Sequence, residues 1–367
     1  MINKVAMKRF KPFLNAETEL KGLTYVLGEN GVGKSSIAQS LLLLKQTFDT
    51  EEAETLNLNG SLIKVGNGVD ALNQNANEDS IDFMITLDSG ERLSVSASYI
   101  QDSDSLPMEQ IDDAAVSVLR ATNVVYLSAD RVGPQLLSAF SASDAAKKRV
   151  SERGENALAL LHAHQRDTLE KDDPRLSEAM DSLSVKSAFD YYLSRISSGA
   201  SIDVANLSNV DSVASTFAFG KSGSLPTERI RPTNVGFGLS YAASIIIACL
   251  LASPGDLLII ENPEAHLHTK GQRTMADLLA RTARSGVQIL CETHSRDFLY
   301  TTRNMIADGS VPEELVSCNL VYRDDTNSMI SEWFPLTKPF HELGEEFEQF
   351  LEFFGSPMDY MQSPGGY

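Results

Sequence analysis

Residues 28 to 35 read Gly-Glu-Asn-Gly-Val-Gly-Lys-Ser, which matches the G-x-x-x-x-G-K-S pattern of a phosphate-binding loop. Its three glycines allow the backbone to turn N–H groups inward without Cβ clashes, so that many donors can face one anion. The loop follows an apolar stretch, Leu23 to Leu27, and precedes an apolar helical run, Ile37 to Leu44. The pattern therefore predicts a strand, a loop and a helix, with the positive end of the helix directed at phosphate.

This loop predicts ATP and Mg²⁺ as ligands. Lys34 is expected to reach the β and γ phosphates, and Ser35 is expected to offer its hydroxyl to Mg²⁺. The predicted nucleotide-binding residues of the stretch are Gly28, Glu29, Asn30, Gly31, Gly33, Lys34, Ser35 and Ser36.

The net charge bears on possible partners. The 367 residues carry a formal charge of −19, although 42% hydrophobic and 22% charged residues are ordinary for a globular protein. Nucleic acids are densely anionic, so this charge does not favour nucleic acid as a partner.

Other sequence features predict a cytoplasmic protein without a membrane segment. The N-terminus has no apolar signal segment, and the three cysteines follow no disulfide or metal pattern. The most apolar window, Tyr241 to Ile260, is interrupted by Ser253-Pro254-Gly255-Asp256, which leaves two pieces too short to span a bilayer.

The first third of the chain is rich in strand signals. Residues 2 to 10 and 16 to 27 have strand character with a turn between them, and a second hairpin is predicted from Ser80–Leu87 and Arg92–Ile100 around Asp88-Ser89-Gly90. A further buried strand is expected at Asn123–Ser128. An antiparallel β lobe is therefore expected beside the phosphate-loop strand.

After residue 134 the pattern changes twice. Residues 135 to 209 are rich in helix formers and predict a helical insertion, a lid or arm, without heptads. Residues 210 to 340 alternate helices with strands, which indicates a mostly parallel sheet. Residues 341 to 367 predict an acidic helix and a disordered tail. With residues 1 to 134, these make four segments of one α/β fold with a mixed sheet.

The stretch from Leu257 to Glu264 is typical of a Walker B strand. Four apolar residues precede Glu261, whose carboxylate would stand at the end of a central strand and orient Mg²⁺ and its waters. Well over half of the chain separates Lys34 from Glu261, so the nucleotide site is expected to be split by a long insertion.

At this point the chain resembles the ABC-type AAA ATPases of the RecF, SMC and OLD-like group. It is most similar to small prokaryotic ATPases whose Walker B segment reads Glu-Asn-Pro-Glu-Ala-His-Leu-His, here Glu261 to His268, as found in anti-phage defence systems. The resemblance also covers residues 8–11, 126–131, 236–240 and 292–295.

The resemblance implies roles and partners. Gly238 and Ser240 would form a signature loop that contacts the nucleotide of a second subunit, so a homodimer or higher oligomer is implied. His294 would be a switch histidine that polarises the γ-phosphate. The family function would be that of a nucleotide-gated switch or scaffold for a separate effector protein, for which a nuclease is one option.

One departure from the wider group affects the chemistry. Glu261-Asn262 stands where that group has Asp-Glu, which moves the metal-orienting carboxylate by about 1.5 Å. Asn262 cannot accept a proton, and loss of a general base costs about 10² to 10⁴ in rate. Slow hydrolysis is therefore expected, with Glu261, Glu264 and His294 as the catalytic candidates and Ser35 and Glu261 as the metal ligands.

Several alternatives remain open on the sequence. A RecF/SMC-like repair ATPase and a scaffold that binds ATP without hydrolysing it both fit the motifs. A transporter ATPase is disfavoured because it would carry a compact LSGGQ signature and a shorter spacing between motifs. A zinc site at Glu264, His266 and His268 is disfavoured because their spacing suits a subunit-contact loop.

The Lys34→Ala variant is expected to lose nucleotide binding while keeping the fold, because the lysine side chain serves the phosphates rather than the core. Titration calorimetry with ATP and the circular dichroism spectrum measure the two properties. An unchanged ATP affinity in a folded variant would contradict the assignment.

Overall fold

The computed structural model describes residues 1–50, 53–220, 229–324 and 329–337. The predicted acidic helix at 342–354 and the predicted tail lie outside these residues. The chain divides into two compact units, one formed by residues 1–121 with the chain from 316 onward, the other by residues 122–315. They are called unit 1 and unit 2, and each is described by itself.

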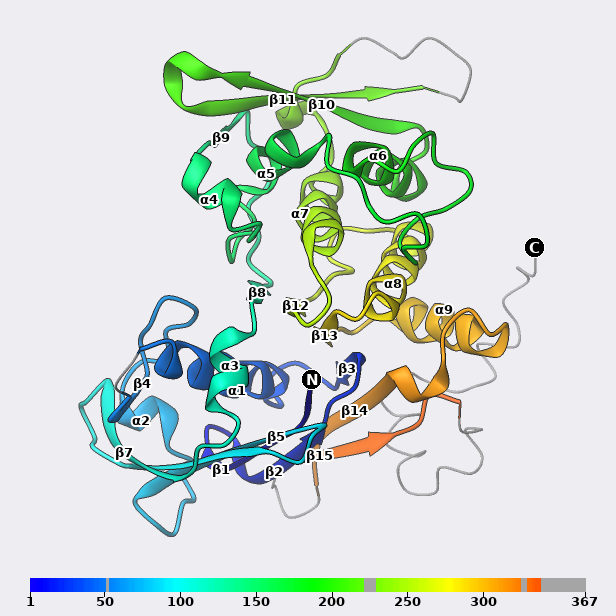
Figure 1. The fold of residues 1–367 in the computed structure, drawn as a ribbon. Helices are drawn as coiled ribbons and strands as arrows, with labels where there is room; N and C mark the ends of the chain where they lie inside the picture. The colour runs from blue at the N-terminus through cyan, green and yellow to red at the C-terminus, as the bar shows by residue number, and fades with distance from the viewer. Residues whose placement is uncertain (51–52, 221–228, 325–328, 338–367) are drawn as a thin grey trace. The chain divides into compact units, whose positions relative to one another are not determined.

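Unit 1 contains an antiparallel sheet with the strand order β2-β1-β5-β6-β7-β4 (Figure 1). Its strands in chain order are β1 (Ile2–Phe10), β2 (Phe13–Glu19), β4 (Thr55–Asn57), β5 (Ser80–Leu87), β6 (Arg92–Ser98) and β7 (Ser105–Asp112). Along β5 and β6 every second residue is buried, as an amphipathic strand requires. The predicted N-terminal hairpin, second hairpin and antiparallel lobe are confirmed.

The phosphate-loop strand of unit 1, β3 (Leu23–Leu27), is buried along its whole length. It pairs in parallel with β14 (Val316–Arg323), which pairs antiparallel with β15 (Met329–Phe334), so the sheet is mixed as predicted. The helix that follows the loop is α1 (Lys34–Phe48), and it packs against β1 and β4. Two short helices, α2 (Gly68–Ala71) and α3 (Val116–Ala121), complete the unit.

Unit 2 contains the other parallel strands, in the order β8-β12-β13. These are β8 (Val124–Leu127), β12 (Leu257–Glu261) and β13 (Gln288–Glu292), and their register places Glu261 beside Glu292. Strand β12 contacts α7 (Phe237–Leu251), and β13 contacts α8 (Thr269–Arg284), which also packs against α9 (Arg296–Ala307). Short 3₁₀ turns occur at Ser208–Val210, Pro232–Asn234 and Glu313–Leu315.

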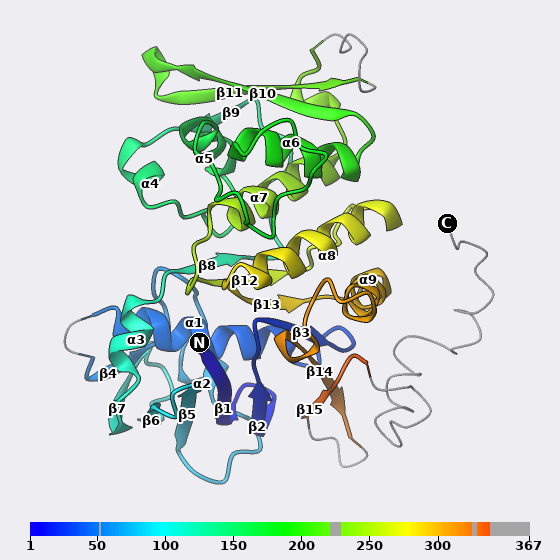
Figure 2. The ribbon, with the colours of Figure 1, turned by 45° about the vertical axis from the view of Figure 1, so that its right-hand side comes forward.

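The segment from 135 to 209 carries both helices and strands. Its helices are α4 (Ala142–Ala146), α5 (Ala157–His164) and α6 (Val185–Ile196). Strands β9 (Leu137–Ala139) and β10 (Ala200–Leu207) pair with β11 (Ser212–Phe219) in a small antiparallel sheet that lies over α5 and α6 (Figures 1 and 2). Since α5 and α6 both contact α7, this segment is built onto the helix that begins at the predicted signature loop.

Among the described residues, no helix is both long enough and apolar enough to cross a membrane. The three cysteines, Cys249, Cys291 and Cys318, are buried and unpaired.

The loop glycines of unit 1 differ in what surrounds them, which predicts unequal effects of substitution. A Cβ on Gly28 would lie 2.2 Å from the carbonyl oxygen of Val321, whereas a Cβ on Gly31 would meet no atom within 4 Å. Both residues have positive φ, 141° and 81°. Gly31→Ala should therefore cost only backbone strain, about 1–2 kcal/mol, and Gly28→Ala should cost about 3 kcal/mol or more because the main chain must move. Urea unfolding measures both, and equal losses would show that the contact with Val321 is unimportant.

Candidate functional site

The phosphate loop has the backbone conformation that its sequence predicts. Gly28, Gly31 and Gly33 all have positive φ, which side-chain-bearing residues rarely adopt. A Cβ on Gly33 would lie 2.4 Å from Cγ of Pro12, so packing also excludes a larger residue there. Glu29, Asn30 and Gly31 are exposed, and Ser35 is half-buried. The eight predicted binding residues therefore lie in one loop with an open tip and in the first turn of the helix that follows it.

Lys34 lies inside this loop. Its side chain is 4% exposed, and its Nζ donates to the carbonyl oxygens of Gly28 at 3.0 Å and Glu29 at 2.6 Å. A buried ammonium group held by loop carbonyls is a preformed cation beside the start of α1.

The N-terminus of α1 has no side-chain cap. Gly33 is the N-cap residue and offers no side-chain oxygen as a cap, and the first turn contains no acidic residue. The first amides of a helix need an acceptor, and the helix dipole favours a negative one. The loop, its buried lysine and this helix end together fit a phosphate group.

The carboxylate of Glu261, at the end of β12, is held in place on both oxygens. Oε1 accepts from the hydroxyl of Tyr126 and Oε2 from the backbone N–H of Ala129, each at 3.1 Å. Burial, followed by the proximity of Glu261, raises the pKa of Tyr126, so the phenol stays a neutral donor. Glu261 is only 9% exposed. Its carboxylate is therefore fixed by the end of the neighbouring strand β8.

Asn262 makes the turn that follows. Its φ of 44° is in the left-handed region, which asparagine tolerates better than most residues, and its N–H donates to the carbonyl oxygen of Glu292 at 2.8 Å. Within the described part of the chain, its Oδ1 is buried and has no hydrogen-bond partner. A buried amide oxygen without a protein partner is unfavourable in isolation, and a bound water or ion or a role in a site would account for it.

Glu264 joins the Walker B segment to the end of β13. Its Oε1 accepts from the backbone N–H of His294 at 2.7 Å, and its Oε2 accepts from the hydroxyl of Thr293 at 2.8 Å. Burial raises the pKa of Glu264, although these hydrogen bonds oppose the rise. The structure thus brings Glu264 and His294 together across 30 positions of sequence.

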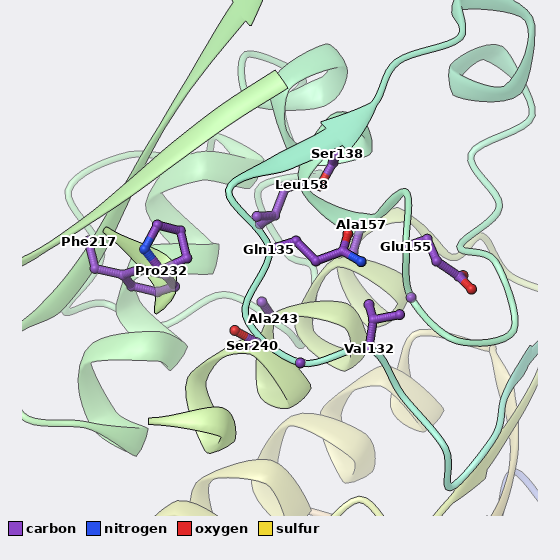
Figure 3. A pocket seen from close by; sticks show the side chains of 12 residues that line it. Val132, Gln135, Ser138, Glu155, Ala157, Leu158, Phe217, Pro232, Ser240 and Ala243 are labelled. Atoms are coloured by element: carbon purple, nitrogen blue, oxygen red, sulfur yellow. The ribbon is translucent and has the colours of Figure 1, made fainter. Parts of the chain in front are cut away.

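The predicted signature residues lie at the start of α7. Gly236 is the N-cap and has no side-chain cap bond, and a Cβ on Gly238 would lie 2.5 Å from the carbonyl oxygen of His266. Ser240 opens into a small pocket that is also lined by Gln135 and Glu155 (Figure 3). Glycine at 238 thus permits close approach of the loop after β12.

The two histidines of the Walker B segment have separate surroundings. His268 is the N-cap of α8, and its Nδ1 accepts from the N–H of Gly271 at 3.1 Å. His266 has a φ of 62° and packs its ring against Tyr241, with 4.9 Å between the centroids. In the described residues, no three His, Cys, Asp or Glu side chains gather as a metal site.

Three residues around Glu261 and Glu264 were not singled out by the sequence. They are Tyr126 and Arg131, which bind the end of β12, and Thr293, which binds Glu264. The sequence placed all three in stretches that carry the family resemblance, 126–131 and 292–295, but it assigned none of them a role. Their contacts depend on neighbouring strands that are distant in sequence.

Comparisons with known proteins agree with this geometry. Residues 23–299 match the family model described as "AAA domain, putative AbiEii toxin, Type IV TA system". A search of proteins with curated function found no match.

Two solved Smc head structures share the fold. One, described as the SmcHead bound to the C-winged helix domain of ScpA, has a TM-score of 0.55 and 14% identity, over 91% of this chain and 98% of that chain. The other is the Smc head domain with an extended coiled coil bound to the C-terminal domain of ScpA derived from Pyrococcus furiosus. Its TM-score is 0.51 at 15% identity, over 97% of this chain and 99% of that one.

The fold and the phosphate loop thus define a P-loop ATPase of the AAA class with the fold of an Smc head. The chain belongs to the AAA-domain family whose model it matches over residues 23–299. The predicted fold class is confirmed.

Substitution of Glu264 should change both stability and its pH dependence. Glu264→Ala leaves the His294 N–H and the Thr293 hydroxyl without this acceptor, which costs about 1–3 kcal/mol. Because the folded pKa is raised, the wild type should lose stability as pH rises from the ordinary glutamate range through the folded pKa. Glu264→Gln keeps an acceptor and cannot ionise, so it should lose less and remove this slope. Thermal melts from pH 4 to 8 test this, and parallel wild-type and Gln curves would contradict it.

Proposed function

We propose that this protein is an ATP-binding, slowly hydrolysing ABC-type ATPase that works as a homodimeric, nucleotide-gated switch for a separate effector in prokaryotic anti-phage defence. The observation that carries the proposal is the loop from Gly28 to Ser35, with its three glycines at positive φ, its buried Lys34 and a helix that begins after a glycine N-cap. These groups suit the phosphates of ATP, and the Ser35 hydroxyl suits Mg²⁺.

Glu261 would orient Mg²⁺ and its waters. Bound Mg²⁺ would supply charge neutralisation on the phosphates. The Glu261 carboxylate suits this role because Tyr126 and Ala129 hold it in one orientation, so little reorganisation is needed on binding.

Slow turnover follows from the residues around Glu261. Asn262 stands where the wider group has a second carboxylate, and an amide cannot take a proton from water. Glu264 already accepts from Thr293 and His294 with both oxygens, so its main role in this proposal is to fix the segment that carries His294. His294 would then polarise the γ-phosphate from a fixed position.

The proposed dimer uses the start of α7. The N-cap residue of α7, Gly236, makes no side-chain cap bond, and Gly238 and Ser240 lie in the first turn of the helix. This helix N-terminus therefore suits the phosphate of a nucleotide that a second subunit holds. The two Smc head structures are described as bound to domains of ScpA, which supports the idea that this fold docks a partner protein. The family description, with its toxin and toxin–antitoxin terms, supports a role in defence.

A scaffold that holds ATP without hydrolysing it is the second candidate, and Asn262 is the observation that favours it. Phosphate release from the purified protein decides between the two. Slow release that Lys34→Ala abolishes supports the ATPase, whereas ATP binding without any release supports the scaffold.

The turnover rate should respond to three substitutions. Asn262→Glu restores a potential base and should raise the rate, by up to about 10²-fold. Glu264→Gln and His294→Ala should lower kcat with little change in ATP affinity, because Glu264 positions the segment of His294 and His294 acts mainly in the transition state. Phosphate release and calorimetry measure the two quantities. A fast wild-type rate that neither Glu264→Gln nor His294→Ala changes would show that other residues are catalytic.

Association should depend on nucleotide. Light scattering is expected to show a larger mass, or tighter association, with ATP and Mg²⁺ than without them. Ser240→Arg should prevent this change, because a bulky cation would fill the first turn of α7. An equal mass under all conditions, in wild type and variant, would argue against an ATP-dependent dimer through this turn.

A further inference from the structure

Arg131 is a buried arginine that binds the turn after β12. Its side chain is 2% exposed. Nη1 donates to the carbonyl oxygens of Ser128 at 2.8 Å and Glu261 at 2.6 Å, and Nη2 donates to that of Asn262 at 2.6 Å. Two successive carbonyls of the Walker B turn are therefore satisfied by one guanidinium group, which comes from the loop after the neighbouring strand.

The same guanidinium group contacts the first turns of α7. Its Cζ lies 5.3 Å from the ring centroid of Tyr241, a cation–π distance. The Tyr241 ring packs edge-on against His266, and the carbonyl of His266 lies over Gly238. The turn after β12 and the start of α7 therefore share a continuous set of contacts within unit 2.

We propose that Arg131 is a positioning residue that couples the Walker B turn to the signature end of α7, so that a change at one is transmitted to the other. The link runs from the carbonyls of Glu261 and Asn262 through the guanidinium group to Tyr241. The functional role of this link rests on the proposed function, in which the Walker B turn binds the nucleotide of its own subunit and the start of α7 binds the nucleotide of the partner subunit. Arg131 would then connect the two nucleotide sites of the dimer.

The chemistry of the link requires arginine. A planar guanidinium group can donate along its edge to two carbonyls while its face lies over an aromatic ring, and lysine cannot do both. The left-handed φ of Asn262 adds a second requirement, because a strained turn persists only when its surroundings hold it. Without the guanidinium group of Arg131, the carbonyl oxygen of Asn262 would lose a short charge-assisted hydrogen bond.

A matched control exists at the other end of α7. Arg175 is 5% exposed, and its Nη1 donates to the carbonyl oxygens of Cys249 and Ala252 at the C-terminus of the helix. Arg131→Lys and Arg175→Lys therefore each remove one buried guanidinium group that contacts α7, the first near the start of the helix and the second at its end. General destabilisation of α7 should follow from both, whereas loss of the link should follow only from the first.

Hydrogen exchange of the nucleotide-free protein, read by mass spectrometry of peptides, tests the link directly. Arg131→Lys is expected to speed exchange about tenfold or more in peptides covering 236–241 and 261–266. Arg175→Lys should speed exchange near 249–252 instead. Tyr241→Leu, which keeps an apolar side chain, should speed exchange at 261–266 and serves if Arg131→Lys fails to fold. Unchanged exchange at 236–241 in a folded Arg131→Lys, or at 261–266 in Tyr241→Leu, overturns the link.

Nucleotide assays then test its functional meaning. Arg131→Lys should lower kcat about tenfold while ATP affinity stays within about twofold, and it should reduce the cooperativity of turnover with ATP concentration. Arg175→Lys should keep wild-type kcat and cooperativity at a temperature below both melting points. Equal kinetic effects of the two variants would overturn the coupling role. If the wild type does not bind ATP, the proposed function is wrong. The hydrogen-exchange experiment would still show whether Arg131 couples the Walker B turn to the start of α7.

Discussion

The end of strand β12 is the constraint on which unit 2 depends. There the chain must leave a buried strand, keep a carboxylate fixed and turn through a left-handed residue while its carbonyls remain out of water. Buried polar groups require partners, and in this turn the carboxylate of Glu261 and the backbone groups of Glu261 and Asn262 have them, whereas Oδ1 of Asn262 has none among the described residues. The partners come from elements distant in sequence: Tyr126, Ala129 and Arg131 after β8, and Glu292 on β13.

The phosphate loop of unit 1 depends mainly on residues that are close together in the sequence. Its glycines, its lysine and the start of α1 follow one another within eight residues, so the predicted anion site belongs to a single stretch of chain. The surrounding packing only excludes larger residues at Gly28 and Gly33. A local site of this kind can be recognised from a sequence pattern, because residues that are close in the sequence are also close in the structure.

In the proposed function, the protein holds its nucleotide longer than simple turnover requires. The observations that support this proposal are a Glu261 carboxylate held on both oxygens, an amide at position 262, and a Glu264 carboxylate that accepts from Thr293 and His294. In the same proposal, Arg131 joins the Walker B turn to the start of α7, so that a change at the Walker B turn alters the helix end that faces the second subunit.

The sequence by itself determined the fold class, the strand–loop–helix order around the phosphate loop, both hairpins and the alternating helices and strands after α7, because these depend on local periodicity and turn residues. It also named Glu261, Glu264 and His294, whose roles stay predictions. Only the tertiary structure showed that Glu264 binds the segment at His294, and that β9, β10 and β11 form a sheet over the helices of the 135–209 segment. The sequence placed Arg131 in the stretch 126–131 that carries the resemblance but could not show its contacts, because they reach carbonyls and a ring about 110 to 130 positions away and leave no periodic pattern.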